Sequence, residues 1–116
     1  CVAHPKYKEA IIRAKERSTV VTGLSTGHPV RVLENKLTKE FFELERSGAT
    51  VEELDNLGAG KLRLAAREGD INHGSVMIGQ VAGLVKEVKT VAEIINEMVH
   101  DIPRIVASVK SMTDMK

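Results

Sequence analysis

Apolar residues recur every three or four positions along most of the chain, a spacing that predicts α-helices. Over residues 4–17, Tyr7, Ala10, Ile11 and Ala14 share one such face, and Pro5 suits the first helical position. The same spacing and capping signals predict further helices over 37–47 before Gly48, from Thr50, over 61–68 before Gly69, and from Thr90 onward. That last helix carries a long apolar stripe containing Pro103, which should kink or break it.

Two short runs follow a different, alternating pattern. Residues 19–22 and 30–33 are rich in β-branched side chains, and Arg31 falls between Val30 and Val32 on the opposite face. The glycine-containing loop 23–29 between them can turn the chain back on itself. The pattern therefore predicts an α+β fold, mostly helical, with a small antiparallel sheet.

The segment 74–84 combines an apolar run with two glycines four positions apart. If it is helical from about Ser75, Gly79 and Gly83 share one face, onto which a backbone or a flat ligand can pack closely. Gln80 places an amide at the edge of that face. Tight helix packing and approach of a ligand both explain the spacing, and close packing is the commoner use of paired small residues.

Composition narrows the class of protein. The chain has 116 residues, which suits one domain and is too short for a (β/α)₈ barrel of about 250 residues. A net charge of +1 with two Phe, one Tyr and no Trp argues against a nucleic-acid partner. Apolar runs are shorter than the roughly 20 residues that span a bilayer, so no membrane segment is expected. The single cysteine, Cys1, fits a reducing compartment and a cytoplasmic location.

Candidate chemistry is sparse in the first half of the chain. His28 lies in the glycine loop, where it could transfer protons or simply hydrogen-bond backbone. Arg31 could clamp an anionic group such as a phosphopantetheine, or tie the loop to a neighbouring element, with Asn35 close behind it. The histidines have no metal-ligand spacing with one another or with Cys1, and no phosphate-binding glycine motif is visible, so no metal site is expected.

Four segments in order resemble the FMN-dependent enoyl-acyl-carrier-protein reductase II and nitronate monooxygenase (2-nitropropane dioxygenase) family: 3–9, 27–35, 68–71 and 74–84. The resemblance covers nearly the whole chain and fades after about Val99. Members of this family are flavin-binding barrels more than twice as long. The resemblance therefore implies that the chain is the C-terminal module of a parent FMN-binding (β/α)₈ barrel enzyme. Within it, 1–17 would be the final barrel-type helix, 18–85 a small α/β second domain, and 86–116 a C-terminal helix returning to the barrel.

The resemblance also implies a site. Ser75, Val76, Met77, Gly79 and Gln80 would lie near the flavin and substrate, with Val76 and Met77 lining the substrate pocket. His28, Arg31 and Asn35 would belong to a substrate-binding or structural loop. The family's catalytic histidine lies upstream, so no catalytic residue is expected in this chain, which should be inactive alone.

The parent enzyme would bind FMN mainly through upstream residues. It would use NAD(P)H to reduce an enoyl thioester on acyl carrier protein, a step of fatty acid biosynthesis, and a homodimeric parent is compatible with the resemblance. One alternative is oxidation of a small nitroalkane substrate by a nitronate monooxygenase. Another alternative, from the long apolar stripe of the C-terminal helix, is a non-catalytic helical interaction module.

Overall fold

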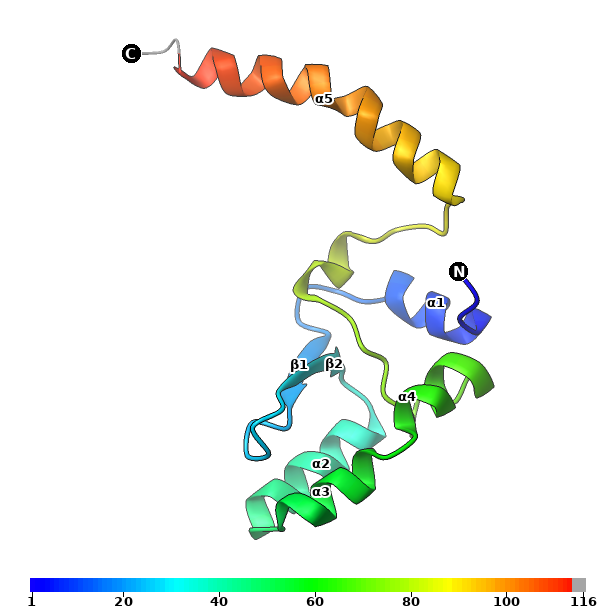
Figure 1. Cartoon of the computed structure of the whole chain (residues 1–116), viewed down its shortest axis with the longest axis vertical. Helices are drawn as coiled ribbons and strands as arrows, with labels where there is room; N and C mark the ends of the chain where they lie inside the picture. Colours follow the sequence, from blue (N-terminus) through cyan, green and yellow to red (C-terminus); the bar gives the residue numbers. More distant parts are fainter. Residues whose placement is uncertain (114–116) are drawn as a thin grey trace. The chain divides into compact units, whose positions relative to one another are not determined.

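The computed structural model describes residues 1–113 and divides the chain into two units, Cys1–Lys86 and the residues from Glu87 onward (Figure 1). The first unit begins with α1 (Pro5–Ile12), whose first turn is capped by His4, with its Nδ1 accepting from the Lys6 N–H at 3.2 Å. The helix begins at Pro5 as predicted but ends well before residue 17. The Ser18 hydroxyl accepts from the Lys15 N–H at 2.8 Å, which supplies a local alternative to the helical hydrogen bond.

A two-stranded antiparallel sheet follows, as predicted. Strand β1 (Thr19–Thr22) pairs with β2 (Val30–Leu33), and Val20 lies opposite Val32. The connecting loop turns at Gly23, whose φ is 75°. A Cβ there would lie 2.7 Å from the His28 carbonyl oxygen, so the turn requires glycine.

Helices α2 (Lys36–Ser47) and α3 (Val51–Gly58) form a hairpin beside the sheet (Figure 1). Gly48 ends α2 in the left-handed region with φ of 80°, as predicted. The predicted capping box opens α3, with the Glu53 carboxylate accepting from the Thr50 N–H at 2.7 Å. A second capping box, formed by Asn35 and Thr38, opens α2.

The predicted helix over 61–68 is present, in two forms. A short α-helical turn, α4 (Lys61–Arg63), continues as a π-helix, η1 (Leu64–Glu68). The Gly69 N–H donates to the Leu64 carbonyl, and Gly69 ends the segment at φ of 77°, as predicted.

The prediction of a helix from about Ser75 is wrong. Residues 75–79 are extended, and Met77 forms an isolated antiparallel bridge with Val32 of β2. The helical part is a 3₁₀-helix, η2 (Gln80–Leu84), so Gly79 and Gly83 do not share the face of one α-helix. Pairing with β2 decides the conformation here, because a distant strand offers hydrogen bonds that no local pattern reveals.

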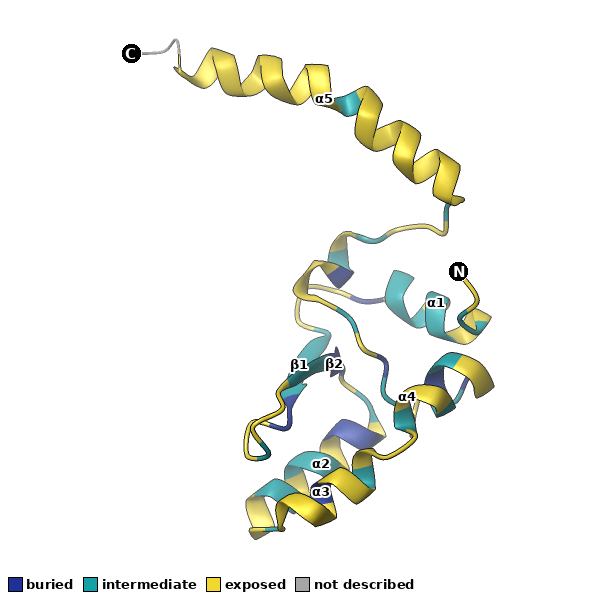
Figure 2. Cartoon of the chain, in the orientation of Figure 1, coloured by how far each residue is buried: buried dark blue, intermediate teal, exposed yellow. Residues whose placement is uncertain are grey.

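The core of the first unit is small and lies where the sheet, η1 and η2 meet. One cluster of buried residues consists of Ala14, Leu33, Ala65, Val76 and Ala82. Figure 2 shows how few segments of the first unit are buried. Tyr7, Ala10 and Ile11 of α1 pack against this cluster. The apolar face predicted for the first helix therefore contributes to the same core as the sheet.

The second unit is a single long helix, α5 (Val91–Thr113). Its predicted capping box is present, with the Glu93 carboxylate accepting from the Thr90 N–H at 2.7 Å. The helix continues through Pro103, and its axis changes direction about halfway along (Figure 1). None of its residues is buried, and no helix in residues 1–113 is long and apolar enough to cross a membrane. The assignment of 1–17 and 86–116 to parts that contact a barrel stays a prediction.

Candidate functional site

A cavity of about 410 Å³ opens between the sheet and the helices α2, α3 and α4 of the first unit. Its wall is mainly apolar, with side chains from both layers: Val30, Val32, Leu37, Phe41, Leu54 and Met77. Leu54 is 1% exposed and Leu37 is 6% exposed, so the floor is rigidly packed. This is the concave, apolar kind of surface that binds small organic ligands.

Polar residues also line this cavity, and of these Thr22 and Thr38 are buried. His28, Asp55, Lys61 and Ser75 line it, and the His28 N–H donates to the Thr26 hydroxyl at 3.3 Å. No buried side-chain nitrogen or oxygen in residues 1–113 lacks a hydrogen-bond partner. The cavity therefore suits an apolar group in its interior and a polar group at its mouth.

Two residues of segment 75–79, Ser75 and Met77, line this cavity, and Met77 is the more exposed of the two. It lies directly opposite Val32, so the two side chains project from the same face of the sheet, and Met77 is 40% exposed. Its backbone carbonyl accepts a hydrogen bond from the Tyr7 hydroxyl at 2.9 Å. The sequence contains no signal for this contact, because the partners are 70 positions apart.

Val76 points to the other side of the sheet segment. It is 1% exposed and belongs to the core cluster, whereas Met77 lies beside the cavity. Ser75 lines the cavity, and its N–H donates to the Lys61 carbonyl at 2.9 Å. Gly79 and Gln80 are exposed where η2 begins. The structure thus brings Ser75 and Met77 to one cavity and places Val76 in the packing beneath it.

Asn35 connects three segments through one amide. Its Oδ1 accepts from the Thr38 N–H at 3.1 Å, and its Nδ2 donates to the carbonyls of Ile71 and Gly74, each at 2.8 Å. All of these are bonds within the protein, which is the arrangement of a structural residue. The spacing of Asn35 and Thr38 could have indicated the cap, but the two long-range bonds leave no local signal.

Arg31 points away from the cavity face. Its Nη1 donates to the Thr19 hydroxyl at 3.0 Å across the sheet, while its neighbours Val30 and Val32 line the cavity. Of the loop residues named from the sequence, His28 and Asn35 line the cavity and Arg31 ties the two strands together.

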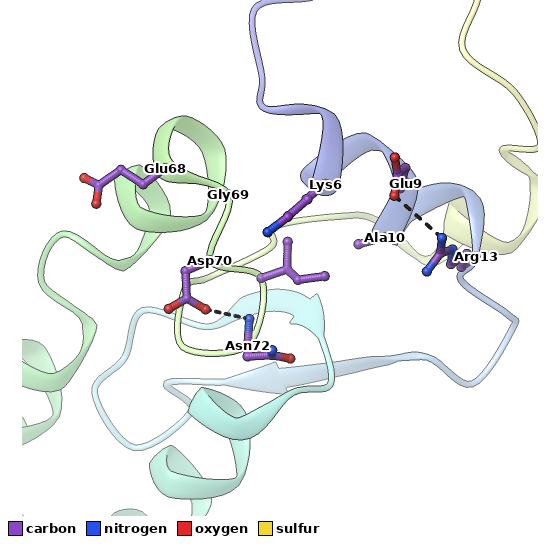
Figure 3. A pocket seen from close by; sticks show the side chains of 9 residues that line it. Lys6, Glu9, Ala10, Arg13, Glu68, Gly69, Asp70 and Asn72 are labelled. Atoms are coloured by element: carbon purple, nitrogen blue, oxygen red, sulfur yellow. Dashed lines mark hydrogen bonds and ion pairs between the residues drawn. The ribbon is translucent and has the colours of Figure 1, made fainter.

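A second hollow, of about 500 Å³, lies between α1 and the turn that follows η1. Figure 3 shows Lys6, Glu9 and Arg13 on one side and Asp70 and Asn72 on the other. Glu9 pairs with Arg13 at 3.6 Å, and the Asp70 carboxylate accepts from the Asn72 N–H at 3.0 Å. Most of these charges are therefore engaged locally, and the hollow is open to solvent.

The described residues of the first unit do not by themselves fit a flavin mononucleotide. Its longer helices are capped by His4, Asn35 and Thr50, whose side chains already accept from first-turn N–H groups that would otherwise face a phosphate. Residues 1–113 also contain no buried orphaned polar atom awaiting a ligand. In the same residues, no group of three or more His, Cys, Asp or Glu side chains could hold a metal ion. We therefore assign no flavin-dependent step to these side chains.

Comparison with known proteins supplies the family. Residues 1–101 match the family model described as nitronate monooxygenase. The structure of FabK from Thermotoga maritima is 38% identical with a TM-score of 0.87, covering 95% of this chain and 35% of that one. A methionine-to-alanine mutant of that FabK is 35% identical with a TM-score of 0.77, covering 95% and 32%. The chain thus spans about a third of the FabK chains that it matches. The chain belongs to the nitronate monooxygenase family.

Proposed function

We propose that this chain is the C-terminal part of an FMN-dependent oxidoreductase whose upstream portion is a (β/α)₈ barrel. That enzyme uses NAD(P)H to reduce enoyl thioesters carried on acyl carrier protein. The observation that carries the proposal is the match over 95% of this chain to FabK, at 38% identity and a TM-score of 0.87. When bound, the flavin supplies hydride transfer, and the upstream portion holds it.

Within that enzyme, these residues bind the substrate and exclude water. The apolar wall of the cavity takes the acyl chain, because burying saturated carbon there contributes about 0.8 kcal/mol per methylene group. Met77 forms an exposed part of that wall, and a thioether adapts to chains of varied shape. His28 and Lys61 at the rim face the polar end of the substrate.

A nitronate monooxygenase is the second candidate, supported by the description of the family model that matches residues 1–101. Its substrate is a small nitroalkane anion. Such a substrate would leave most of a 410 Å³ apolar cavity unfilled, so we favour the acyl substrate.

A non-catalytic interaction module is less well supported. The apolar stripe of α5 includes Ile94, Ile95, Met98 and Ile102, which are 40–65% exposed. Among residues 87–113, the part of the second unit that the structure describes, no other helix or strand covers this stripe. A stripe of this kind needs a covering surface. We propose that the upstream barrel supplies that surface.

Turnover by the intact parent polypeptide tests the proposal. We expect NADH or NADPH oxidation that depends on a short enoyl thioester, and a colourless, inactive preparation of this chain alone. Oxygen consumption with a nitronate, without thioester reduction, would establish the second candidate. Turnover of the thioester by this chain alone would refute the assignment of the chemistry to the upstream portion.

Met77→Ala in the parent tests the role of the cavity. We expect a raised KM for the thioester and little change in melting temperature, because Met77 is 40% exposed. Leu24→Ala, in the first unit, 70% exposed and outside the cavity lining, is the control and should leave KM unchanged. Unchanged kinetics with a large loss of stability would show that Met77 acts only in packing.

A further inference from the structure

The hydrogen bond between Tyr7 and Met77 joins the first helix to the wall of the cavity. The Tyr7 hydroxyl lies 2.9 Å from the Met77 carbonyl oxygen, and the Tyr7 ring packs against the core cluster. The contact therefore links a fixed point of the core to Met77, the one residue of 75–79 that is both exposed and beside the cavity.

The sheet leaves the Met77 carbonyl available for this bond. The Leu33 N–H donates to the Val76 carbonyl oxygen at 2.9 Å, and the Ile78 N–H donates to the Arg31 carbonyl oxygen at 3.2 Å. In such an antiparallel pair, the residue between these bonds directs its own N–H and C=O away from the partner strand. The Tyr7 hydroxyl thus occupies the side of the segment that β2 does not reach.

This bond is placed where it can control the direction of the Met77 side chain. Val76, on one side, is 1% exposed and fixed in the core. On the other side, Gly79 has open space around the position of a Cβ, and it leads into the exposed start of η2. The peptide that follows Met77 is therefore the last backbone unit held on both sides before the chain becomes exposed.

We propose that Tyr7 is a positioning residue, whose hydroxyl fixes the Met77 peptide so that the thioether forms the cavity wall and sets which acyl chains fit. This inference rests on the proposed function, because it takes the cavity as the acyl site. Burial raises the pKa of Tyr7, against the opposing effect of its bond to Met77, so the hydroxyl keeps its proton and donates at neutral pH.

Tyr7→Phe in the intact parent enzyme tests the proposal, since it removes the hydroxyl and keeps the ring in the core. Loss of a hydrogen bond of ordinary net strength changes an equilibrium constant by a factor of about 2 to 12. We expect KM for the enoyl thioester to rise by a factor in that range, with kcat changed less than KM. Thr19→Val is the matched control, because it removes a hydroxyl that bonds Arg31 across the two-stranded sheet and is not bonded to Met77. It should leave KM unchanged.

Amide hydrogen exchange gives a second readout that does not depend on turnover. In the chain of residues 1–116, Tyr7→Phe should speed exchange of the Ile78 N–H by a similar factor, and Thr19→Val should not. Unchanged exchange and unchanged KM would overturn the positioning role. A third outcome is faster Ile78 N–H exchange in Tyr7→Phe together with no thioester reduction by the wild-type parent enzyme. It would overturn the proposed function and the acyl part of this inference, while confirming the Tyr7–Met77 contact.

Discussion

Asn35 offers the sharpest test of what holds the cavity together. Its side chain caps α2 through Thr38 and also binds the carbonyls of Ile71 and Gly74. These two carbonyls belong to the turn that leads into segment 75–79. Removing the Nδ2 donors while keeping the cap should therefore loosen the turn that sets the position of Met77. The substitution Asn35→Ser does this, because serine is also a good N-cap residue.

The expected magnitude follows from the bonds. Each Nδ2 bond is worth about 0.5–1.5 kcal/mol net, so Asn35→Ser should lower the free energy of unfolding by about 1–3 kcal/mol. Asn35→Ala also removes the cap and should cost about 1 kcal/mol more. For a domain of this size, each 1 kcal/mol lowers the melting temperature by roughly 4–8 °C.

Urea unfolding of wild type and both variants measures these differences, with the m-value confirming that the unfolding transition is the same. The order of stability should be wild type, then Asn35→Ser, then Asn35→Ala. Wild-type stability in Asn35→Ser would refute the argument, because the two long-range bonds would then contribute nothing. An equal loss of unfolding free energy in both variants would show that the cap contributes nothing and that the two bonds to the turn account for the whole effect.

Two further predictions concern the same turn. Gly74→Ala would place a Cβ 2.5 Å from the Asp70 carbonyl oxygen and should lower the free energy of unfolding by about 3 kcal/mol, measured by thermal unfolding. Gly79→Ala is the control, because the space around Gly79 is open, and it should be neutral or raise the free energy of unfolding by about 0.4–1 kcal/mol. Hydrogen bonds from the His73 backbone and side chain hold the pKa of Asp70 below its ordinary value of 3.8. The stability from Asp70 is thus complete above about pH 5 and is lost as the pH falls through the folded-state pKa, so Asp70→Asn should flatten the acid limb of a pH–stability curve.

The parts of the fold that the sequence predicts correctly are those decided within a few residues. The capping boxes at Thr50 and Thr90 need only a glutamate three positions later, and Gly48 and Gly69 supply the left-handed conformation that ends a helix. The first helix is predicted too long, because it ends at Ile12 and the Lys15 N–H beyond it bonds to the Ser18 hydroxyl.

The parts that the sequence does not predict depend on distant partners. The spacing of the glycines in 74–84 predicts a helix from about Ser75, but the Leu33 N–H and the Arg31 carbonyl pair with segment 75–79 in an extended conformation. The predicted conformation of this segment is therefore wrong, and its role in a binding site stays a prediction. The residues that define the cavity from the other layer, such as Leu37 and Leu54, have an ordinary helical spacing that indicates burial and not a cavity.

The extended conformation also changes how the packing and functional interpretations of this segment relate. On a helix, close packing and approach of a ligand would both need the same glycine-lined face, so only one of the two interpretations could hold. On a strand, alternate side chains point to opposite faces, so Val76 and Ile78 pack with the core while Met77 between them faces the cavity. Anchoring on one face fixes the side chain on the other, which is the condition a binding site needs. The same segment can therefore be part of the core and part of the site, and substitutions at 76 and 77 should separate stability from substrate handling.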